Sequence, residues 1–434
     1  MTGFLDANDD PGVHAPSYYA ATAVGGLRSH ALEGGGSTDV AIIGGGYAGL
    51  SAAYHLAKAG VAVTLIEAHR IGWGASGRNG GQIGSTPRID MTWYERQVGR
   101  DDARKVFEIA REANTLVRDL AAASTIDCEL CDGVLEVNHR RSFDAESEAY
   151  VAHMRETYGI DDYDYIPPEH MTDYVRGKGY YGGALDRRAG QLHPLNYALA
   201  LGLAAREAGA KIYTMTRATA LDLSGDGVSI RTPVGVLTAK SLILAVNGYH
   251  DDLAPAYARR VMPINNFILA TEPLGDLAKA VIPADVAVAD SRFAVNYFRL
   301  SRDGRMLFGG GESASAYFPG DIGAFVRKRM LRIFPELSEA KIDYAWGGTL
   351  GISRNRTPIF QRIGPSAIAI GGWSGSGVHM ATMGGKIAAE AVRGQLERFD
   401  LLSKIPSPAF PGGPGLRSPL LRLALAWFRL RDWV

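Results

Sequence analysis

The sequence predicts an α/β protein, α+β overall, in which two discontinuous domains are interleaved along the chain. Three observations predict this organisation. A complete strand–helix–strand unit lies near the N-terminus, a similar passage begins near residue 190, and a strand, a glycine-rich turn and a helix follow near residue 370. Charged helical segments and aromatic strands lie between them. We therefore expect one domain with a Rossmann-like parallel sheet and a second domain with an antiparallel sheet.

The predicted domain boundaries lie where these patterns change. Residues 1–37 form an N-terminal arm rich in glycine, alanine and proline. Residues 38–90, 180–260 and 340–400 form the first domain, and residues 91–179 and 261–339 form the second. Residues 401–434 form a C-terminal tail with a helix. The chain, at 434 residues, is long enough for two or three domains.

The first strand–helix–strand unit is the clearest element. Residues 39–43 form an apolar run that is typical of a buried strand. Ala59 and Gly60 end the helix that follows, and residues 61–66 form the second strand. The helix has apolar residues at the spacing i, i+3, i+4 and i+7, namely Leu50, Ala53, Tyr54 and Ala57.

The later elements follow from the same periodicities. Further helices are predicted over residues 101–120, 195–208 and 382–393. Further strands are predicted over residues 134–137, 211–216, 241–246, 293–300, 306–309 and 368–371.

Composition excludes several classes of protein. Lysine plus arginine and aspartate plus glutamate number 46 each, so no basic surplus points to a nucleic-acid partner. Cys128 and Cys131 are the two cysteines of the chain, which excludes a disulfide-stapled secreted fold. Residues 1–16 lack the basic and apolar regions of a signal peptide, and no apolar run approaches the ~20 residues that span a bilayer. We expect a cytoplasmic protein.

A dinucleotide fingerprint, Gly44-x-Gly46-x-x-Gly49, lies between the first strand and its helix. Gly44 permits the tight turn, Gly46 lets a pyrophosphate approach the backbone, and Gly49 lets helix and strand pack closely. The helix N-terminus offers free N–H groups to the phosphates. Glu67, at the end of the second strand, would accept hydrogen bonds from ribose hydroxyls. The motif alone does not separate FAD from NAD.

Two further glycine-rich segments favour FAD over NAD. Residues 72–82 form a second polar, glycine-dense loop, for which an NAD domain has no need. Residues 371–377 form a turn before the last helix, whose N-terminus can face the flavin ring. A helix dipole at that position would stabilise the negative charge of reduced flavin.

Five segments together resemble one family closely: SYYAATA (17–23), DVAIIGGGYAGLSAA, IEAHRIGWGASGRNGGQ, QLHPLNYALAL (191–201) and FPGG (410–413). The chain resembles the γ-glutamylputrescine oxidoreductases, within the D-amino-acid-oxidase and sarcosine-oxidase group of flavoproteins. The resemblance runs nearly end to end, and its most specific part is GWGASGRNGGQ. It implies a cytoplasmic FAD enzyme of putrescine catabolism and polyamine degradation. Such enzymes oxidise a primary amine to an imine, which water converts to an aldehyde and ammonia, while dioxygen becomes hydrogen peroxide.

The resemblance also implies which residues contact FAD. They belong to the glycine-rich loops, the acidic strand end, the adenine-side strand and the last turn. They are Gly44, Gly46, Tyr47, Ala48, Gly49, Glu67, Ala68, Gly74, Ala75, Ser76, Gly77, Arg78, Asn79, Gly80, Gly81, Gln82, Ala218, Asn247, Gly248, Gly372, Gly375, Ser376 and Gly377.

The chain departs from the family pattern in the last turn and at the positions of flavin attachment. Gly375-Ser376-Gly377 replaces a frequent Gly-His-Gly, and His379 lies nearby but out of register. No cysteine follows Cys131 and no histidine lies in the GRNGG loop, so we expect noncovalent FAD. The lysine that activates oxygen in sarcosine oxidases falls near Leu307, which makes oxygen reactivity less secure than amine oxidation.

The substrate pocket is expected beneath the aromatic strands. The pocket candidates are Tyr297, Phe298, Arg299, Trp373 and His250, although each aromatic residue is more commonly a core or wall residue than a substrate contact. Aromatic faces would attract a cationic amine by roughly 0.5–2 kcal/mol, and Arg299 would hold a γ-glutamyl carboxylate unless it forms an ion pair between strands.

The positions of the arginine residues near residue 350 bear on whether the substrate is an α-amino acid. Those enzymes hold the substrate carboxylate with an arginine whose position falls here near residues 350–351. Arg354 and Arg356 lie a little further on, which favours an amine over an α-amino acid.

Other signals carry less weight. Cys128-x-x-Cys131 lacks the second cysteine pair of a structural zinc site, so we expect plain thiols and no metal. The tail after Pro414 has an apolar helical face, which would dock on protein more readily than on a membrane surface. The alternatives are an oxidase or dehydrogenase of another secondary amine or N-methyl amino acid, an NAD(P)H-dependent flavin monooxygenase, or a noncatalytic electron-transfer subunit.

Overall fold

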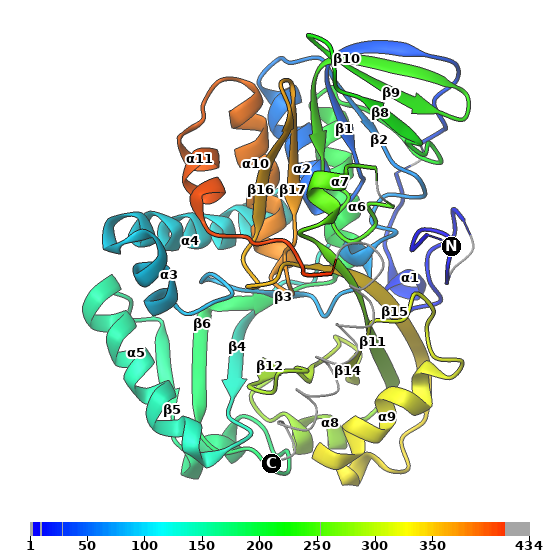
Figure 1. Ribbon diagram of the computed structural model, residues 1–434. Coiled ribbons are helices and arrows are strands. Elements are labelled where there is room, and N and C mark those ends of the chain that lie inside the picture. Colours follow the sequence, from blue (N-terminus) through cyan, green and yellow to red (C-terminus); the bar gives the residue numbers. More distant parts are fainter. Residues whose placement is uncertain (1–2, 9–10, 28, 252, 413–434) are drawn as a thin grey trace.

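The computed structural model describes residues 3–8, 11–27, 29–251 and 253–412, and it contains two sheets (Figure 1). The first sheet has the strand order β16-β17-β10-β1-β2-β7. Its central strands β10, β1 and β2 are parallel, while β9 pairs antiparallel with the first half of β10 and β8 pairs with β9. Its strands are β1 (Gly36–Ile43), β2 (Val63–Ile66), β7 (Lys211–Tyr213), β8 (Ala220–Asp222), β9 (Val228–Thr232), β10 (Gly235–Leu244), β16 (Ile359–Gly364) and β17 (Ala367–Gly371).

The second sheet has the order β15-β11-β14-β13-β12-β4-β6-β3, with β5 beside β6. All its pairs are antiparallel except β12 with β4, which is parallel. Its strands are β3 (Gln82–Ile83), β4 (Cys131–Val137), β5 (Tyr163–Ile166), β6 (Gly183–Gln191), β11 (Met262–Pro273), β12 (Ala287–Asp290), β13 (Tyr297–Leu300), β14 (Arg305–Ser313) and β15 (Ile342–Ile352).

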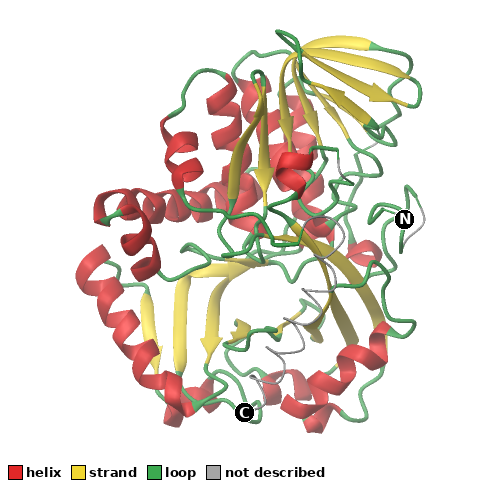
Figure 2. Ribbon diagram, viewed as in Figure 1, coloured by secondary structure: helices red, strands yellow, loops and turns green. Residues whose placement is uncertain are grey.

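Helices cover one face of each sheet (Figure 2). In the first domain α2, α6, α10 and α4 pack on one another and contribute to the largest hydrophobic core. Their buried residues are mostly alanine and leucine. In the second domain α9 packs on β11, β14 and β15. The helices are α1 (Tyr18–Thr22), α2 (Tyr47–Lys58), α3 (Met91–Val98), α4 (Arg100–Ala122), α5 (Asp144–Tyr158), α6 (Pro194–Glu207), α7 (Pro255–Ala258), α8 (Asp276–Val281), α9 (Ile322–Ile333), α10 (Gly377–Val392) and α11 (Glu397–Lys404).

The predicted fold class is confirmed: a parallel sheet and a largely antiparallel sheet alternate along one chain. The domain ranges differ in detail from the prediction. The ranges 38–90, 180–260 and 340–400 each contain a strand of the second sheet, namely β3, β6 and β15. Short-range periodicity identifies a strand but not its partner, so the sequence pattern could not assign these three.

Several element boundaries also differ from the prediction, for example that of β10, which begins at Gly235 and not at residue 241. Helix α10 begins at Gly377 and not at residue 382, because the glycine-rich turn ends at Ser376. The strand predicted over 293–300 begins at Tyr297, since Asn296 and the bend before it bind the buried carboxylate of Asp290, with Asn296 N 2.9 Å from Asp290 Oδ1. Strand β7 ends at Tyr213 and not at residue 216.

The predicted helix of the C-terminal tail falls largely on residues 413–434, which lie outside the described residues. Among the described residues, no helix combines the length and apolar character needed to cross a bilayer.

Candidate cofactor and substrate site

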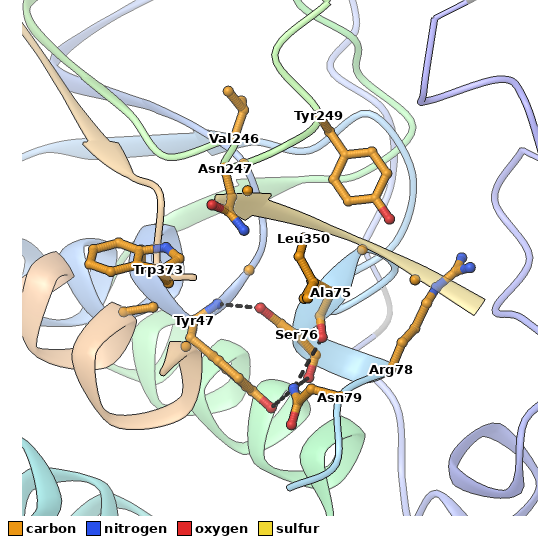
Figure 3. A pocket seen from close by; sticks show the side chains of 18 of the residues that line it. Tyr47, Ala75, Ser76, Arg78, Asn79, Val246, Asn247, Tyr249, Leu350 and Trp373 are labelled. Atoms are coloured by element: carbon orange, nitrogen blue, oxygen red, sulfur yellow. Dashed lines mark hydrogen bonds between the residues drawn. The ribbon is translucent and has the colours of Figure 1, made fainter. Parts of the chain in front are cut away.

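A cavity of about 620 Å³ lies between the carboxyl ends of β1, β2 and β10 and the facing surface of the second sheet. This volume lies within the ~300–1,000 Å³ of ligand pockets. Figure 3 shows Tyr47, Ser76 and Asn79 on one side of this cavity, with Trp373, Asn247 and Tyr249 around its rim. The cavity also follows the rule that open α/β sheets bind ligands beyond the carboxyl ends of their strands.

The glycine fingerprint is shaped by close backbone packing. Gly44 has φ +113°, and a Cβ on it would lie 2.6 Å from the carbonyl oxygen of Ala245. A Cβ on Gly49 would lie 1.9 Å from the carbonyl oxygen of Gly44. Gly46 caps α2 without a side-chain hydrogen bond. The first turn of α2 therefore opens its N–H groups toward the cavity, as a phosphate site requires.

Glu67 lies at the end of β2, where its carboxylate accepts hydrogen bonds from the N–H of Gly45 (2.5 Å) and the N–H of His69 (2.8 Å). Burial raises the pKa of Glu67, while the backbone donors oppose that shift. Glu67 lines the cavity, so its free acceptor capacity faces the place where a ribose would lie.

The second glycine-rich loop is held by two of its own side chains (Figure 3). Asn79 Nδ2 donates to the carbonyls of Ala75 (3.0 Å) and Ser76 (3.1 Å) and to the hydroxyl of Tyr47 (3.2 Å). Ser76 Oγ accepts from the N–H of Tyr47 at 3.1 Å. The loop is thereby fastened to the N-terminus of α2.

Arg78 joins this loop to the second sheet. Its Nε donates to the carbonyl of Trp73 (2.6 Å) and its Nη1 to that of Gly347 in β15 (3.1 Å). Its guanidinium also lies 4.5 Å from the ring centre of Trp73, and Trp346 Nε1 donates to the Arg78 carbonyl at 2.9 Å. Both domains therefore hold the loop in one position.

The last glycine-rich turn precedes α10. Its Gly372 N–H donates to Asn247 Oδ1 at 3.0 Å, and Ser374 N–H donates to the Gly351 carbonyl at 3.1 Å. Gly372, Ser374 and Gly375 all have positive φ. The N-cap of α10 makes no side-chain hydrogen bond. A second helix N-terminus thus faces the cavity, on the side away from Glu67.

The residues present fit an FAD molecule. The cavity is lined by two helix N-termini whose N-cap residues make no side-chain hydrogen bond, by the carboxylate of Glu67 and by glycines without room for a Cβ. Trp73 Nε1 is buried with no hydrogen-bond partner among the described residues, and Trp73 lines the same cavity. Buried donors are normally satisfied, so this one suits a bound ligand.

The cofactor residues predicted from sequence divide into two groups. Those that line the cavity are Gly44, Gly46, Tyr47, Ala48, Glu67, Ala68, Gly74, Ala75, Ser76, Arg78, Asn79, Gly80, Gln82, Ala218, Asn247, Gly375 and Gly377. Those that do not line it are Gly49, Gly77, Gly81, Gly248, Gly372 and Ser376. At four of these glycines, a Cβ would lie within 2.7 Å of a backbone atom of another residue, so the lack of a side chain permits close packing there. The four are Gly49, Gly77, Gly81 and Gly248.

Three of the five pocket candidates line the cavity: Tyr297, Trp373 and His250. The Tyr297 hydroxyl donates to Asn266 Oδ1 at 2.7 Å, and its ring lies against Gly309, where a Cβ would be 2.1 Å from Tyr297 Cζ. His250 Nε2 lies 3.2 Å from the Val261 carbonyl.

Phe298 and Arg299, the other two pocket candidates, do not line the cavity. Phe298 points to the opposite face of its strand, where its ring stacks on that of Phe308 at 5.5 Å. Arg299 is 4% exposed and donates to the carbonyls of Gly80 (3.0 Å) and Leu192 (3.1 Å). Arg299 therefore holds the glycine-rich loop at Gly80 in place, and its guanidinium is not available to a substrate carboxylate.

Several charged residues of the cavity were not predicted from the sequence. Arg88, Glu312 and Arg356 all line it. The Arg88 guanidinium carbon lies 3.9 Å from a Cβ built on Gly375, beside the last turn. Burial, and next the charge of Arg356, lower the pKa of Arg88. No local motif marks Arg88 or Glu312. Arg356 was noted only for its place in the chain, as too far along for a carboxylate clamp.

Arg356 follows a strained turn. Its φ is +62°, in the left-handed region, and its guanidinium carbon lies 4.4 Å from the ring centre of Phe293. The turn directs the Arg356 side chain to the cavity. The position of Arg356 along the chain therefore did not predict that it lines the cavity.

His379 positions the segment that carries Arg88. Its Nδ1 accepts from the N–H of Gly84 at 3.2 Å, so Nε2 carries the proton and donates to the Thr86 carbonyl at 3.2 Å. Burial lowers the pKa of His379 to about 4. His193 is similar: Nδ1 accepts from the N–H of Asn196 at 3.1 Å, and burial lowers its pKa to about 4. Both rings are neutral at pH 7.

Acidification should destabilise the protein through these two rings. The folded-state pKa values lie below the value of 6.5 for an unfolded histidine. The contribution of the two neutral rings to the free energy of unfolding is therefore fully present above pH 6.5 and is lost as the pH falls toward 4. Each ring contributes a slope of up to ~1.4 kcal/mol per pH unit. The urea midpoint of the apoprotein, measured from pH 7 to pH 5, should decline steadily. Burial also lowers the pKa of His14 and His55 to about 4, so in His379→Gln the decline should be roughly a quarter less steep, and an unchanged slope would contradict the assignment.

The two cysteines, Cys128 and Cys131, are free thiols. Burial raises the pKa of Cys128 to about 12, so its thiol stays protonated, and neither cysteine forms a disulfide. Within the described part of the chain, no group of three or more potential ligands could hold a metal ion.

The family described as "FAD dependent oxidoreductase" matches residues 39–391. A probable oxidoreductase, OrdL, of Rhizobium meliloti is 41% identical over 96% of this chain and 97% of its own length. The gamma-glutamylputrescine oxidoreductase of Escherichia coli is 36% identical over 96% of this chain and 98% of its own length. The glycine oxidase of Bacillus cereus superposes with a TM-score of 0.68 at 20% identity, over 86% of this chain and 99% of that one, and shares the fold. The chain therefore belongs to the FAD-dependent oxidoreductase family.

Proposed function

We propose that FAD binds noncovalently along this cavity, with its adenosine near Glu67 and its flavin near the turn before α10. The N-termini of α2 and α10 support this orientation, since the first suits the pyrophosphate and the second the reduced ring. Cys128 and Cys131, the two cysteines of the chain, are not cavity-lining residues, and neither is a ready flavin anchor. Acid precipitation should leave the flavin in the supernatant, and yellow precipitated protein would contradict noncovalent binding.

We further propose that the substrate is a primary amine with a carboxylate at its far end, most specifically γ-glutamylputrescine. The observation that carries this proposal is the cavity wall, which combines the cations Arg88 and Arg356, the carboxylate Glu312 and the aromatic rings of Tyr297 and Trp373. Guanidinium groups suit a carboxylate, and a carboxylate with aromatic faces suits an ammonium. The similarity to a gamma-glutamylputrescine oxidoreductase supports the same class.

The reaction is oxidation of the terminal amine. Bound FAD supplies the acceptor for the two electrons and the hydrogen lost from the amine Cα. The protein binds and orients the substrate, and the Tyr297 ring, fixed by Asn266 and Gly309, forms a rigid wall. Loss of two electrons and two protons gives the imine, and hydrolysis by water then yields the aldehyde and ammonia.

We propose dioxygen as the final acceptor, which becomes hydrogen peroxide. No lysine is among the described residues that line the cavity, so the positive charge that favours electron transfer to dioxygen would come from Arg88 and Arg356. A dehydrogenase with another acceptor is the second candidate, because the activating lysine of sarcosine oxidases has no counterpart at the buried Leu307.

Anaerobic bleaching of the flavin tests the substrate. γ-Glutamylputrescine should bleach the enzyme faster than putrescine or sarcosine, and air should then restore the colour with one peroxide per amine. Bleaching by sarcosine alone would overturn the substrate assignment. Bleaching without reoxidation in air would favour the dehydrogenase, and colour loss that requires NADPH would favour a monooxygenase.

A further inference from the structure

The N-terminal arm is attached to the first domain through His69. The N–H of Gly12 donates to His69 Nδ1 at 3.2 Å, so the proton lies on Nε2, which faces the carbonyl of Leu5 at 3.3 Å. The backbone N–H of the same histidine donates to Glu67 at 2.8 Å. One residue thus joins two points of the arm to the carboxylate expected to bind the ribose.

An ion-pair bridge fastens the first residues of the arm. Arg217 lies 2.8 Å from an oxygen of Asp6 and 2.9 Å from an oxygen of Asp251. The N–H of Phe4 also donates to Asp251 at 3.2 Å. Leu5, Arg217 and Asp251 all line the cavity, so the bridge lies in the cavity wall and not on a distant surface.

Asn8 ties the arm to the second domain. Its Nδ2 donates to the carbonyl of Ala316 at 2.8 Å, and its Oδ1 accepts from the N–H of Phe318 at 2.7 Å. These residues follow β14 of the second sheet. Residues 3–8 therefore reach from the edge of the first domain to a loop of the second, beside the cavity.

We propose that residues 3–8 form a strap that closes the adenosine end of the FAD site, with Leu5 as its inner wall, and that this strap retains the cofactor. The proposal rests on noncovalent FAD in this cavity. A noncovalent cofactor leaves at the rate at which its enclosure opens. The hydrogen bonds of Asn8 and the ion pairs of Arg217 must break together before the strap opens, which makes release slow and places FAD binding before strap docking.

Flavin release tests the strap. The holoenzyme and a variant that lacks residues 1–8 would be diluted, and released flavin would be followed by its fluorescence. We expect the truncation to release FAD about 10- to 100-fold faster, to bind it no more slowly, and to leave thermal unfolding of the apoprotein unchanged. Equal release rates would overturn the proposal. An apoprotein destabilised as much as the holoenzyme would also overturn it, because the arm would then be merely structural.

Point variants separate the strap from its surroundings. Leu5→Ser and Asn8→Ala should each speed release, while Val13→Ser should not, because Val13 belongs to the same arm but is 58% exposed. Faster release in Val13→Ser alone would contradict the assignment of Leu5. Release rates are independent of turnover, so slow release from an enzyme that oxidises no amine would leave the strap standing and reject the proposed substrate.

Discussion

Alanine at Gly49 should strongly weaken FAD binding. A Cβ at this position would lie 1.9 Å from the carbonyl oxygen of Gly44 and 3.3 Å from Ile42 Cγ2. The first contact is with backbone, which cannot rotate away, so α2 must move from the turn that its N-terminus supports. Overpacking of this kind costs ~3 kcal/mol or more, which corresponds to a loss of at least ~10²-fold in FAD affinity. The ratio of flavin to protein absorbance in the purified variant measures the effect.

Gly225→Ala is the matched control for Gly49→Ala. Gly225 lies in the turn between β8 and β9, a Cβ there would meet nothing within 4 Å, and its φ is not positive. This variant should keep the wild-type flavin content. A Gly49→Ala protein that is fully yellow would mean that the helix is not held against the glycine turn in the way described.

The glycine-rich half of the cavity was largely predictable because its signals are local. Gly44, Gly46 and Glu67 lie within one strand–helix–strand unit, where the turn, the helix start and the strand end follow one another in the chain. Each requires a particular residue type for a backbone reason that does not depend on distant segments. The cavity-lining residues of the loop from Gly74 to Gln82 follow directly from the same unit.

The substrate half was less predictable because its signals are nonlocal. Tyr297 and Phe298 are neighbours in β13 with opposite faces, and both faces are buried, so alternation alone does not show which ring meets the cavity. Arg299 shares the face of Tyr297 but is covered by the Gly80 loop, a contact between residues more than two hundred positions apart. Aromatic composition indicated the correct strand, and tertiary packing selected the residue.

Charged wall residues were missed for a related reason. Arg88 reaches the cavity because His379, from the last helix, holds the backbone of Gly84 and Thr86. Glu312 belongs to β14, whose position depends on pairing with β11 and β13. Nothing near either residue in the chain signals a ligand. The charge character of the cavity therefore becomes visible only when distant segments are brought together.

Replacing Arg88 by alanine should impair carboxylate-bearing amines selectively. If the guanidinium holds the far carboxylate, its loss leaves that carboxylate unpaired in a desolvated cavity, which costs ~2–5 kcal/mol. We expect kcat/KM for γ-glutamylputrescine to fall by about 10² or more, mainly through KM. An amine of similar length without a carboxylate, such as N-acetylputrescine, should lose less than about tenfold. The ratio of the two kcat/KM values isolates the carboxylate from general damage.

Arg354→Ala is the appropriate control, since Arg354 is exposed, lies two residues from Arg356 and does not line the cavity. It should behave as wild type with both amines.

An equal loss with both amines in Arg88→Ala would indicate a role of Arg88 at the flavin, because Arg88 also lies beside Gly375 in the turn before α10. Its charge would then act on the flavin, and slowed bleaching with an unchanged substrate ratio would contradict the carboxylate assignment. Arg88→Lys separates the two roles further: a lysine keeps the charge but not the bidentate geometry, so it should restore flavin chemistry more fully than carboxylate selectivity.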